Sequence, residues 1–229
     1  MDKYIRIFIL TIFVGVLSSC EMDNLDEPTA GLYGKIIDEK DGTLVPQDII
    51  QGSVIELREA GYANVAPQNL VIKNNGTYEN SRLFENMYTV QPVRTNFQLV
   101  APQEVKIAGR TMLDFTVKPY IRILEPKIEK VGTKIVATFK LEQTTADLVK
   151  KIGLYSHRDP NVGEFMQTSR TEVTLNALAV PDQIYTVELE TAGNANIIVG
   201  RTYYFRIGAL TAAPETKSNY APQVVSFTF

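Results

Sequence analysis

The chain has 229 residues, of which 45% are hydrophobic and 21% are charged, a composition typical of a globular protein with one large domain or two small ones. Its 26 acidic and 23 basic residues give a net charge of −3, and the basic residues form no run, which argues against a nucleic-acid partner. The one cysteine excludes a disulfide framework and a thiolate metal cage, and the one histidine excludes a His-rich zinc site. Gly-rich phosphate loops, paired CxxC motifs and HExxH are also absent from the sequence, so we expect no metal and no cofactor.

Residues 1–19 are predicted to be a lipoprotein signal peptide. A short positive region precedes an apolar run of about 11 residues, which is the size of a signal-peptide core and too short to span a bilayer. The run ends in a segment that resembles a bacterial lipobox, in which the signal is cut before the cysteine and the cysteine is acylated: Leu17, Ser18, Ser19 and Cys20. The alternative is an ordinary secretory signal with an incidental cysteine at its cleavage site.

Residues 20–30 are predicted to be a tether, because the stretch Glu21–Pro28 is acidic, ends in proline and cannot bury enough apolar surface to fold. Acidic residues just past the cysteine resemble the surface-export signal of Bacteroidetes lipoproteins. A solvated linker without an export role is the alternative. We expect a protein held in the outer membrane by its lipid and facing the cell exterior, since two or three acyl chains anchor stably.

From Gly31 onward, short alternating apolar runs are separated by turn signals, a pattern typical of antiparallel sandwiches. The first predicted domain is 31–118. Its turn signals are Asp38–Gly42 and Asn74–Thr77, and the second is the strongest hairpin signal in the chain. Its expected strands are 31–37, 54–58, 70–72, 88–91, 104–108 and 111–117.

The second predicted domain is 119–229, and it follows a junction at Lys118-Pro119-Tyr120, where proline cannot donate to a sheet ladder. Its expected strands are 121–124, 133–141, 152–155, 172–175, 185–189, 201–209 and 223–229. About seven strands in roughly 110 residues suit an immunoglobulin-like sandwich. A helical turn is expected at most over 146–151. The predicted fold is thus all-β, with two consecutive antiparallel β-sandwich domains.

Motifs in each domain resemble known sandwich families. In the first domain, the order Gly34–Asp38, Asn75–Tyr78, Leu83–Val90 is similar to the transthyretin-like or carboxypeptidase-regulatory-like sandwich, with Asn86-Met87 where that family prefers Pro-Gly. In the second, the run GRTYYFRIGA resembles the penultimate strand of fibronectin type III domains.

The fibronectin type III resemblance implies two roles for aromatic residues. Tyr203 would be the tyrosine-corner residue, with its hydroxyl bonded back to the backbone. The buried tryptophan of that family is absent, because the chain has no tryptophan, and Phe139 is our candidate to fill its core position.

Together with the lipobox and the segment Asp114–Tyr120, these motifs resemble a two-domain Bacteroidetes lipoprotein family, DUF3823, over essentially the whole mature chain. Its members look like products of glycan-utilisation loci beside the SusC/SusD-type outer-membrane uptake pair. The resemblance implies a role in surface nutrient acquisition, with those transport proteins or a glycan as partners, and no demonstrated activity.

No motif indicates catalysis. A triad is not expected around His157, and Asp159 with Asn161 offers too few oxygens for calcium, so a loop is the preferred interpretation. No pair of carboxylates stands out for a glycosidase. Three aromatic residues in predicted loops are candidates for ligand contact, although local packing is the favoured alternative for each: Tyr62, Phe97 and Phe165.

The sequence therefore favours a non-catalytic cell-surface lipoprotein that acts as an accessory or interaction module of an outer-membrane glycan-acquisition system. Two alternatives stay open. The chain could bind a glycan directly, or it could be an adhesin or envelope-structural protein that uses the same sandwiches for protein contacts.

Overall fold

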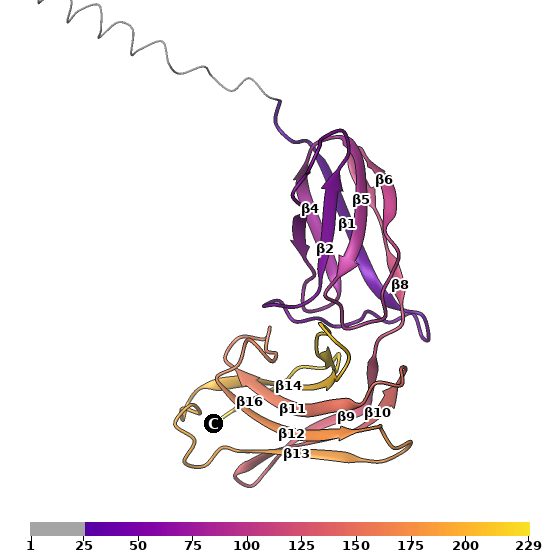
Figure 1. Cartoon of the computed structure of the whole chain (residues 1–229). Coiled ribbons are helices and arrows are strands. Elements are labelled where there is room, and N and C mark those ends of the chain that lie inside the picture. Colours follow the sequence, from indigo (N-terminus) through magenta and orange to yellow (C-terminus); the bar gives the residue numbers. More distant parts are fainter. Residues whose placement is uncertain (1–25) are drawn as a thin grey trace, which may run out of the picture.

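The computed structural model describes residues 26–229, and these contain strands but no helix (Figure 1). The predicted signal peptide and Cys20, with Leu17, Ser18 and Ser19, lie outside the described residues. Within the described part, no helix is long and apolar enough to cross a membrane. The all-β prediction is confirmed.

The N-terminal sandwich packs two sheets face to face. In one sheet β1 lies between β4 and β7 and also pairs with β8. Its strands are β1 (Ala30–Asp38), β4 (Thr77–Leu83), β7 (Arg110–Met112) and β8 (Phe115–Val117). The other sheet has the order β3-β2-β5-β6. Its strands are β2 (Val54–Glu59), β3 (Gln68–Val71), β5 (Asn86–Val93) and β6 (Gln103–Ile107). Alternate residues such as Leu32, Ile55 and Val90 fill the space between the sheets.

The C-terminal sandwich also has two sheets. The three-stranded sheet has the order β13-β10-β9, and its strands are β9 (Ile121–Val131), β10 (Lys134–Gln143) and β13 (Tyr185–Glu190). In the second sheet the order is β12-β11-β14-β15, with β16 also paired to β14. Its strands are β11 (Val149–His157), β12 (Ser169–Ala177), β14 (Thr202–Thr211), β15 (Asn219–Tyr220) and β16 (Val225–Thr228).

The structure confirms that Phe139 is buried in this second core and that the Tyr203 hydroxyl is bonded back to the backbone. Phe139 is buried, and its ring stacks on Tyr185 with the centroids 6.2 Å apart. The hydroxyl of Tyr203 accepts a hydrogen bond from the backbone N–H of Ile198, five residues upstream, at 3.0 Å. Both side chains therefore fix the core of the sandwich.

Three local predictions were wrong. The Asn74–Thr77 turn forms, but β3 and β4 belong to different sheets, so the turn crosses between sheets and makes no hairpin. The expected strand 111–117 is split into β7 and β8, both parallel to β1, because Leu113 and Asp114 bond instead to Tyr78 and to the N–H of Lys35. The segment 146–151 leads into β11 and forms no helical turn.

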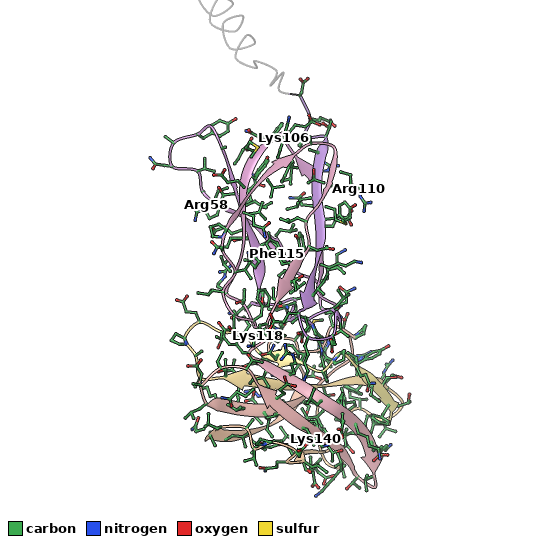
Figure 2. The ribbon with its side chains drawn as sticks, turned by 90° about the vertical axis from the view of Figure 1, so that its right-hand side faces the viewer. Arg58, Lys106, Arg110, Phe115, Lys118 and Lys140 are labelled. Atoms are coloured by element: carbon green, nitrogen blue, oxygen red, sulfur yellow. The ribbon has the colours of Figure 1, made fainter. Side chains whose placement is uncertain are left out.

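The two sandwiches are stacked end to end, with the strands of the second running crosswise to those of the first (Figure 1). We define the distal pole of the N-terminal sandwich as the loops 60–67, 84–85 and 108–109, where residues 26–30 enter β1. The opposite end carries the loops 39–53, 72–76 and 94–102, and these meet the C-terminal sandwich. Figure 2 shows Lys106 at the distal pole, Phe115 inside the sandwich and Lys118 at the junction.

Candidate functional site in the cleft between the domains

A cleft of about 370 Å³ opens where the two sandwiches meet. One wall comes from the turns 38–46 and 74–75 of the N-terminal sandwich. The other comes from residues 119 and 121–124 at the start of β9 and from residues 219, 220 and 222. Its position between domains and its volume are those of sites that bind small molecules.

The N-terminal wall is built by the two turns that the sequence predicted. Gly42 has a φ of 74° and donates its N–H to the carbonyl of Asp38 at 3.0 Å, which closes the first turn. Gly76 closes the second with a φ of 84°, and a Cβ there would lie 2.5 Å from the carbonyl oxygen of Val45. The two turns therefore pack against each other through glycine.

Arg122 joins the two walls. Its Nε and Nη2 bond to the two carboxylate oxygens of Asp38 at 2.6 and 2.7 Å, and its Nη1 bonds to Glu142 at 2.9 Å. Lys40 binds the other oxygen of Glu142. The bond with Asp38 raises the pKa of Arg122, and the bond from Lys40 lowers the pKa of Glu142. Arg122 and Glu142 thus carry opposite charges at neutral pH.

The rim of the cleft carries polar groups with spare hydrogen-bonding capacity. The hydroxyl and N–H of Thr43 donate to Oδ1 of Asp41 at 2.6 and 2.9 Å, which lowers the pKa of that carboxyl. Asn75 accepts from Thr77 through its Oδ1. Within residues 26–229, the side-chain nitrogen of Asn75 and the side-chain amide of Asn74 bond to no protein atom. Such groups suit a ligand with several hydroxyls.

Arg206 locks the sandwiches together behind the cleft. It is only 2% exposed, and its guanidinium donates to the carbonyls of Gln47 and Asn74, in the other domain, at 3.0 and 3.1 Å. It also donates to the carbonyls of Val162 and Ala221 in its own domain. Burial lowers the pKa of Arg206 to about 10, so it remains charged at neutral pH.

Two further contacts hold the cleft in one geometry. The Tyr220 ring lies under the guanidinium of Arg206 at 4.4 Å, and its hydroxyl donates to Asp48 at 2.8 Å. The side chain of Asn219 donates to the carbonyl of Asn96 at 2.7 Å. These groups are buried and paired, which fixes the relative position of the two walls.

The predicted aromatic site residues lie apart. Phe97 is fully buried in the N-terminal core, so ligand contact by Phe97 is contradicted and its packing alternative holds. Tyr62 is 68% exposed in the loop after β2, at the distal pole. Phe165 is exposed near the junction, where its N–H reaches Asp48. Since β2 separates the loop of Tyr62 from that of Asp48, Tyr62 and Phe165 form no common site.

His157 was expected in a loop but is the last residue of β11, where it pairs with Tyr204, and a local turn follows it. Its Nδ1 accepts the N–H of Asp159 at 2.9 Å, and the carboxylate of Asp159 accepts the N–H and the side-chain amide of Asn161. Among residues 26–229, no group of three or more His, Cys, Asp or Glu could hold a metal ion.

Neither of the two arginines between the domains, Arg122 and Arg206, was predicted from the sequence as a site residue. Arg122 and Arg206 each follow an apolar residue and precede another, so alternation places them on a solvent face. The nearest signal was their position beside the predicted junction and in the fibronectin-like strand. The alternation of apolar and polar residues along a strand does not indicate that a second domain will bury an arginine on its polar face.

Two family models match the chain. The model described as the N-terminal domain of a protein of unknown function (DUF3823) matches residues 30–118, and the model of the domain of unknown function DUF3823_C matches residues 121–225. No curated protein matches.

Several crystal structures are similar over the whole fold. One from Bacteroides uniformis ATCC 8492, described as a "putative carbohydrate binding protein", is 34% identical with a TM-score of 0.78, and the match covers 88% of this chain and 100% of that one. A DUF3823 family protein from Parabacteroides merdae ATCC 43184 is 18% identical with a TM-score of 0.75, over 89% and 100% of the two chains. One from Bacteroides ovatus ATCC 8483 is 23% identical with a TM-score of 0.69, over 86% and 97%.

Proposed function

The chain belongs to the DUF3823 family, and from this membership we propose that it is a non-catalytic accessory or interaction module of an outer-membrane glycan-acquisition system. In this proposal Cys20 carries the lipid anchor, the body faces the cell exterior, and SusC/SusD-type transport proteins are the partners. The lipobox-like segment and the acidic tether support the location.

We also propose that the protein binds a glycan directly, in the cleft between its domains. One observation carries this second function. The relative from Bacteroides uniformis, which is 34% identical over its full length, is described as a "putative carbohydrate binding protein". The cleft supplies a preformed site of suitable volume, because the contacts around Arg206 and Tyr220 fix its walls.

The lining of the cleft suggests how a sugar would be held. Asp41, Asn74 and Asn75 offer hydrogen bonds to hydroxyl groups, while Leu44 and Leu124 offer aliphatic contacts. Tyr220 is the one aromatic residue that lines the cleft in the described chain, and its ring is buried under Arg206. Binding would thus depend on hydrogen bonds and aliphatic contacts, without a stacking platform, and we expect modest affinity.

Calorimetry and affinity electrophoresis against a panel of polysaccharides test glycan binding. For any glycan that binds, Asn74→Ala and Leu124→Ala should each weaken the affinity by about tenfold, since each removes a contact worth roughly 1.4 kcal/mol. Asn196→Ala, an exposed residue outside the cleft, is the matched control. Failure of the wild type to bind any glycan of the panel would remove direct glycan binding.

A pull-down of tagged protein from solubilised outer membrane tests the accessory role. Co-purification of a transporter pair is expected. Recovery of the protein without such a pair would favour the adhesin or envelope-structural alternative.

A further inference from the structure

Three large apolar side chains are exposed at the distal pole. Tyr62, Phe84 and Met87 are 68%, 46% and 40% exposed. Their loops touch: the N–H of Ala60 donates to the carbonyl of Met87 at 2.8 Å, and the hydroxyl of Tyr88 donates to the carbonyl of Phe84 at 3.0 Å. The three residues therefore lie on adjoining loops of one pole, and we call them the distal apolar cluster.

The chain enters the N-terminal sandwich at this same pole. Ala30, the first residue of β1, pairs with Leu83, and the N–H of Gly31 bonds to the carbonyl of Gly109 at 2.8 Å (Figure 1). Ten residue steps separate Ala30 from Cys20, and a fully extended chain of that length spans at most about 35 Å. An acyl group on Cys20 would thus keep the distal pole close to the bilayer surface.

The charges around the cluster are mixed. Lys106 lies at this pole in Figure 2, and Arg82 is exposed near the end of β4. Glu59 and Glu85 lie on the adjoining segments. The two basic side chains are long enough to reach lipid phosphates, while the acidic residues balance them, so attraction to the membrane would come mainly from the apolar group.

We propose that the distal apolar cluster docks on the lipid surface that holds the anchor, so that the N-terminal sandwich stands on the membrane by its distal pole. Tyrosine side chains are favoured at the level of lipid headgroups. The acyl chains proposed for Cys20 already anchor the protein stably, so docking of the cluster would fix the orientation of the body and not its attachment. The inference rests on the acylation of Cys20 in the proposed function. The cluster supplies the second contact and sets which end of the body faces the bilayer.

The absence of tryptophan from the chain allows a direct test. Tyr62→Trp puts a lone indole fluorophore in the cluster, and Ile184→Trp puts one in a loop of the C-terminal sandwich where the native residue is 65% exposed. Each full-length variant is purified from envelopes, its acylation is established by mass spectrometry, and it is reconstituted into phospholipid vesicles with spin-labelled headgroups.

We expect the label to quench the indole emission of the Tyr62→Trp variant by about twofold or more, because a docked cluster lies within roughly 5–10 Å of the headgroup boundary. The emission of the Ile184→Trp variant should not change. Equal quenching of the two variants, or none in either while the acylated protein floats with the vesicles, would overturn the docking.

Two other outcomes are separable from these. Protection of the indole of the Tyr62→Trp variant in native envelopes but not in pure lipid would also overturn the docking, in favour of a protein partner. Absence of the acyl group would contradict the proposed anchor instead, so failure of the anchor and failure of the docking are distinct results.

Discussion

Arg206 and Arg122 both lie between the domains, and they differ in what surrounds them. Arg206 is bonded only to backbone carbonyls and covered on all sides, whereas Arg122 is paired with two carboxylates at the edge of the cleft. Within the described part of the chain, the guanidinium of Arg206 hydrogen-bonds to no carboxylate, and its buried charge is favoured by the Tyr220 ring beneath it and by the nearby carboxylate of Asp48. The carboxylates of Asp38 and Glu142 balance the charge of Arg122 at the solvent-accessible edge of the cleft.

This difference indicates that the two arginines have different roles in the interface. The region around Arg206 fixes the relative position of the sandwiches, and the region around Arg122 shapes the open cleft. The first should dominate stability and the second should affect ligand binding, so substitutions in the two regions separate these roles.

The largest effect is expected for Arg206→Met. Four backbone carbonyls would lose a buried donor, although that of Asn74 keeps the N–H of Gln47. We expect a loss of about 4 kcal/mol in the free energy of unfolding, since each unsatisfied buried group costs roughly 1–3 kcal/mol. Urea denaturation should show two transitions in place of one, as the domains uncouple. Arg201→Met, an exposed change just before β14, should stay within about 0.5 kcal/mol of wild type. A single transition with wild-type stability would show that Arg206 does not couple the two domains.

Arg122→Met should cost about 2–3 kcal/mol, because the buried Asp38 carboxylate keeps only the N–H of Lys40 as a partner. One cooperative transition should remain, since the contacts of Arg206 are intact. Lys127→Met on the same strand, with its exposed pair to Glu129, is the control for a mere loss of charge. Two transitions in this variant would contradict the division between the regions.

Tyr220→Phe removes a hydroxyl that donates to Asp48 and accepts the N–H of Glu164, and leaves the ring under Arg206. We expect a loss of about 1–2 kcal/mol in chemical denaturation. Tyr204→Phe is the matched change, because within the described residues its hydroxyl makes no hydrogen bond. Equal losses of stability in Tyr220→Phe and Tyr204→Phe would show that the ring of Tyr220 contributes to stability and that its hydroxyl does not.

The smallest effect is expected for Glu142→Gln, about 0.5–1 kcal/mol at pH 7, since its bond with Lys40 is partly exposed and screened by water. The pKa of Glu142 is lowered in the folded protein, so its contribution is complete above the ordinary value of 4.5 and is lost as the pH falls through the folded pKa. Melting curves of wild type and variant should therefore approach each other as the pH falls below 4.5 and coincide once it is below the folded pKa. A difference in melting temperature that persists below the folded pKa of Glu142 would show that the charged pair is not its cause.

Local sequence patterns predicted the core well where alternation matched burial. Phe139 and Tyr203 are in the expected places because each lies in a regular run on one face of a strand. The strand β4 was missed, because its buried residues Tyr78 and Leu83 are an odd number of positions apart. A bulge in β4 itself, between Asn80 and Leu83 and opposite Ala30 and Leu32, lets both face the core.

The cleft could not be predicted in the same way. Its walls are turns such as Asp38–Gly42 and Asn74–Gly76, whose residues were explained by turn chemistry alone. Their position opposite β9 depends on how two domains dock, and that docking is carried by single buried contacts of Arg206, Tyr220 and Asn219. No periodic pattern records contacts of this kind.

The course of β1 has a mechanical consequence. The strand begins at the pole where the chain enters and ends at Asp38, which Arg122 grips in the cleft. A force on a molecule bound in the cleft would be transmitted along β1 toward the predicted tether, residues 20–30. Ladder hydrogen bonds run across the strands, perpendicular in the antiparallel pair with β4 and slanted in the parallel pairs with β7 and β8. The bonds to all three strands would therefore share that load in shear and would not open one after another.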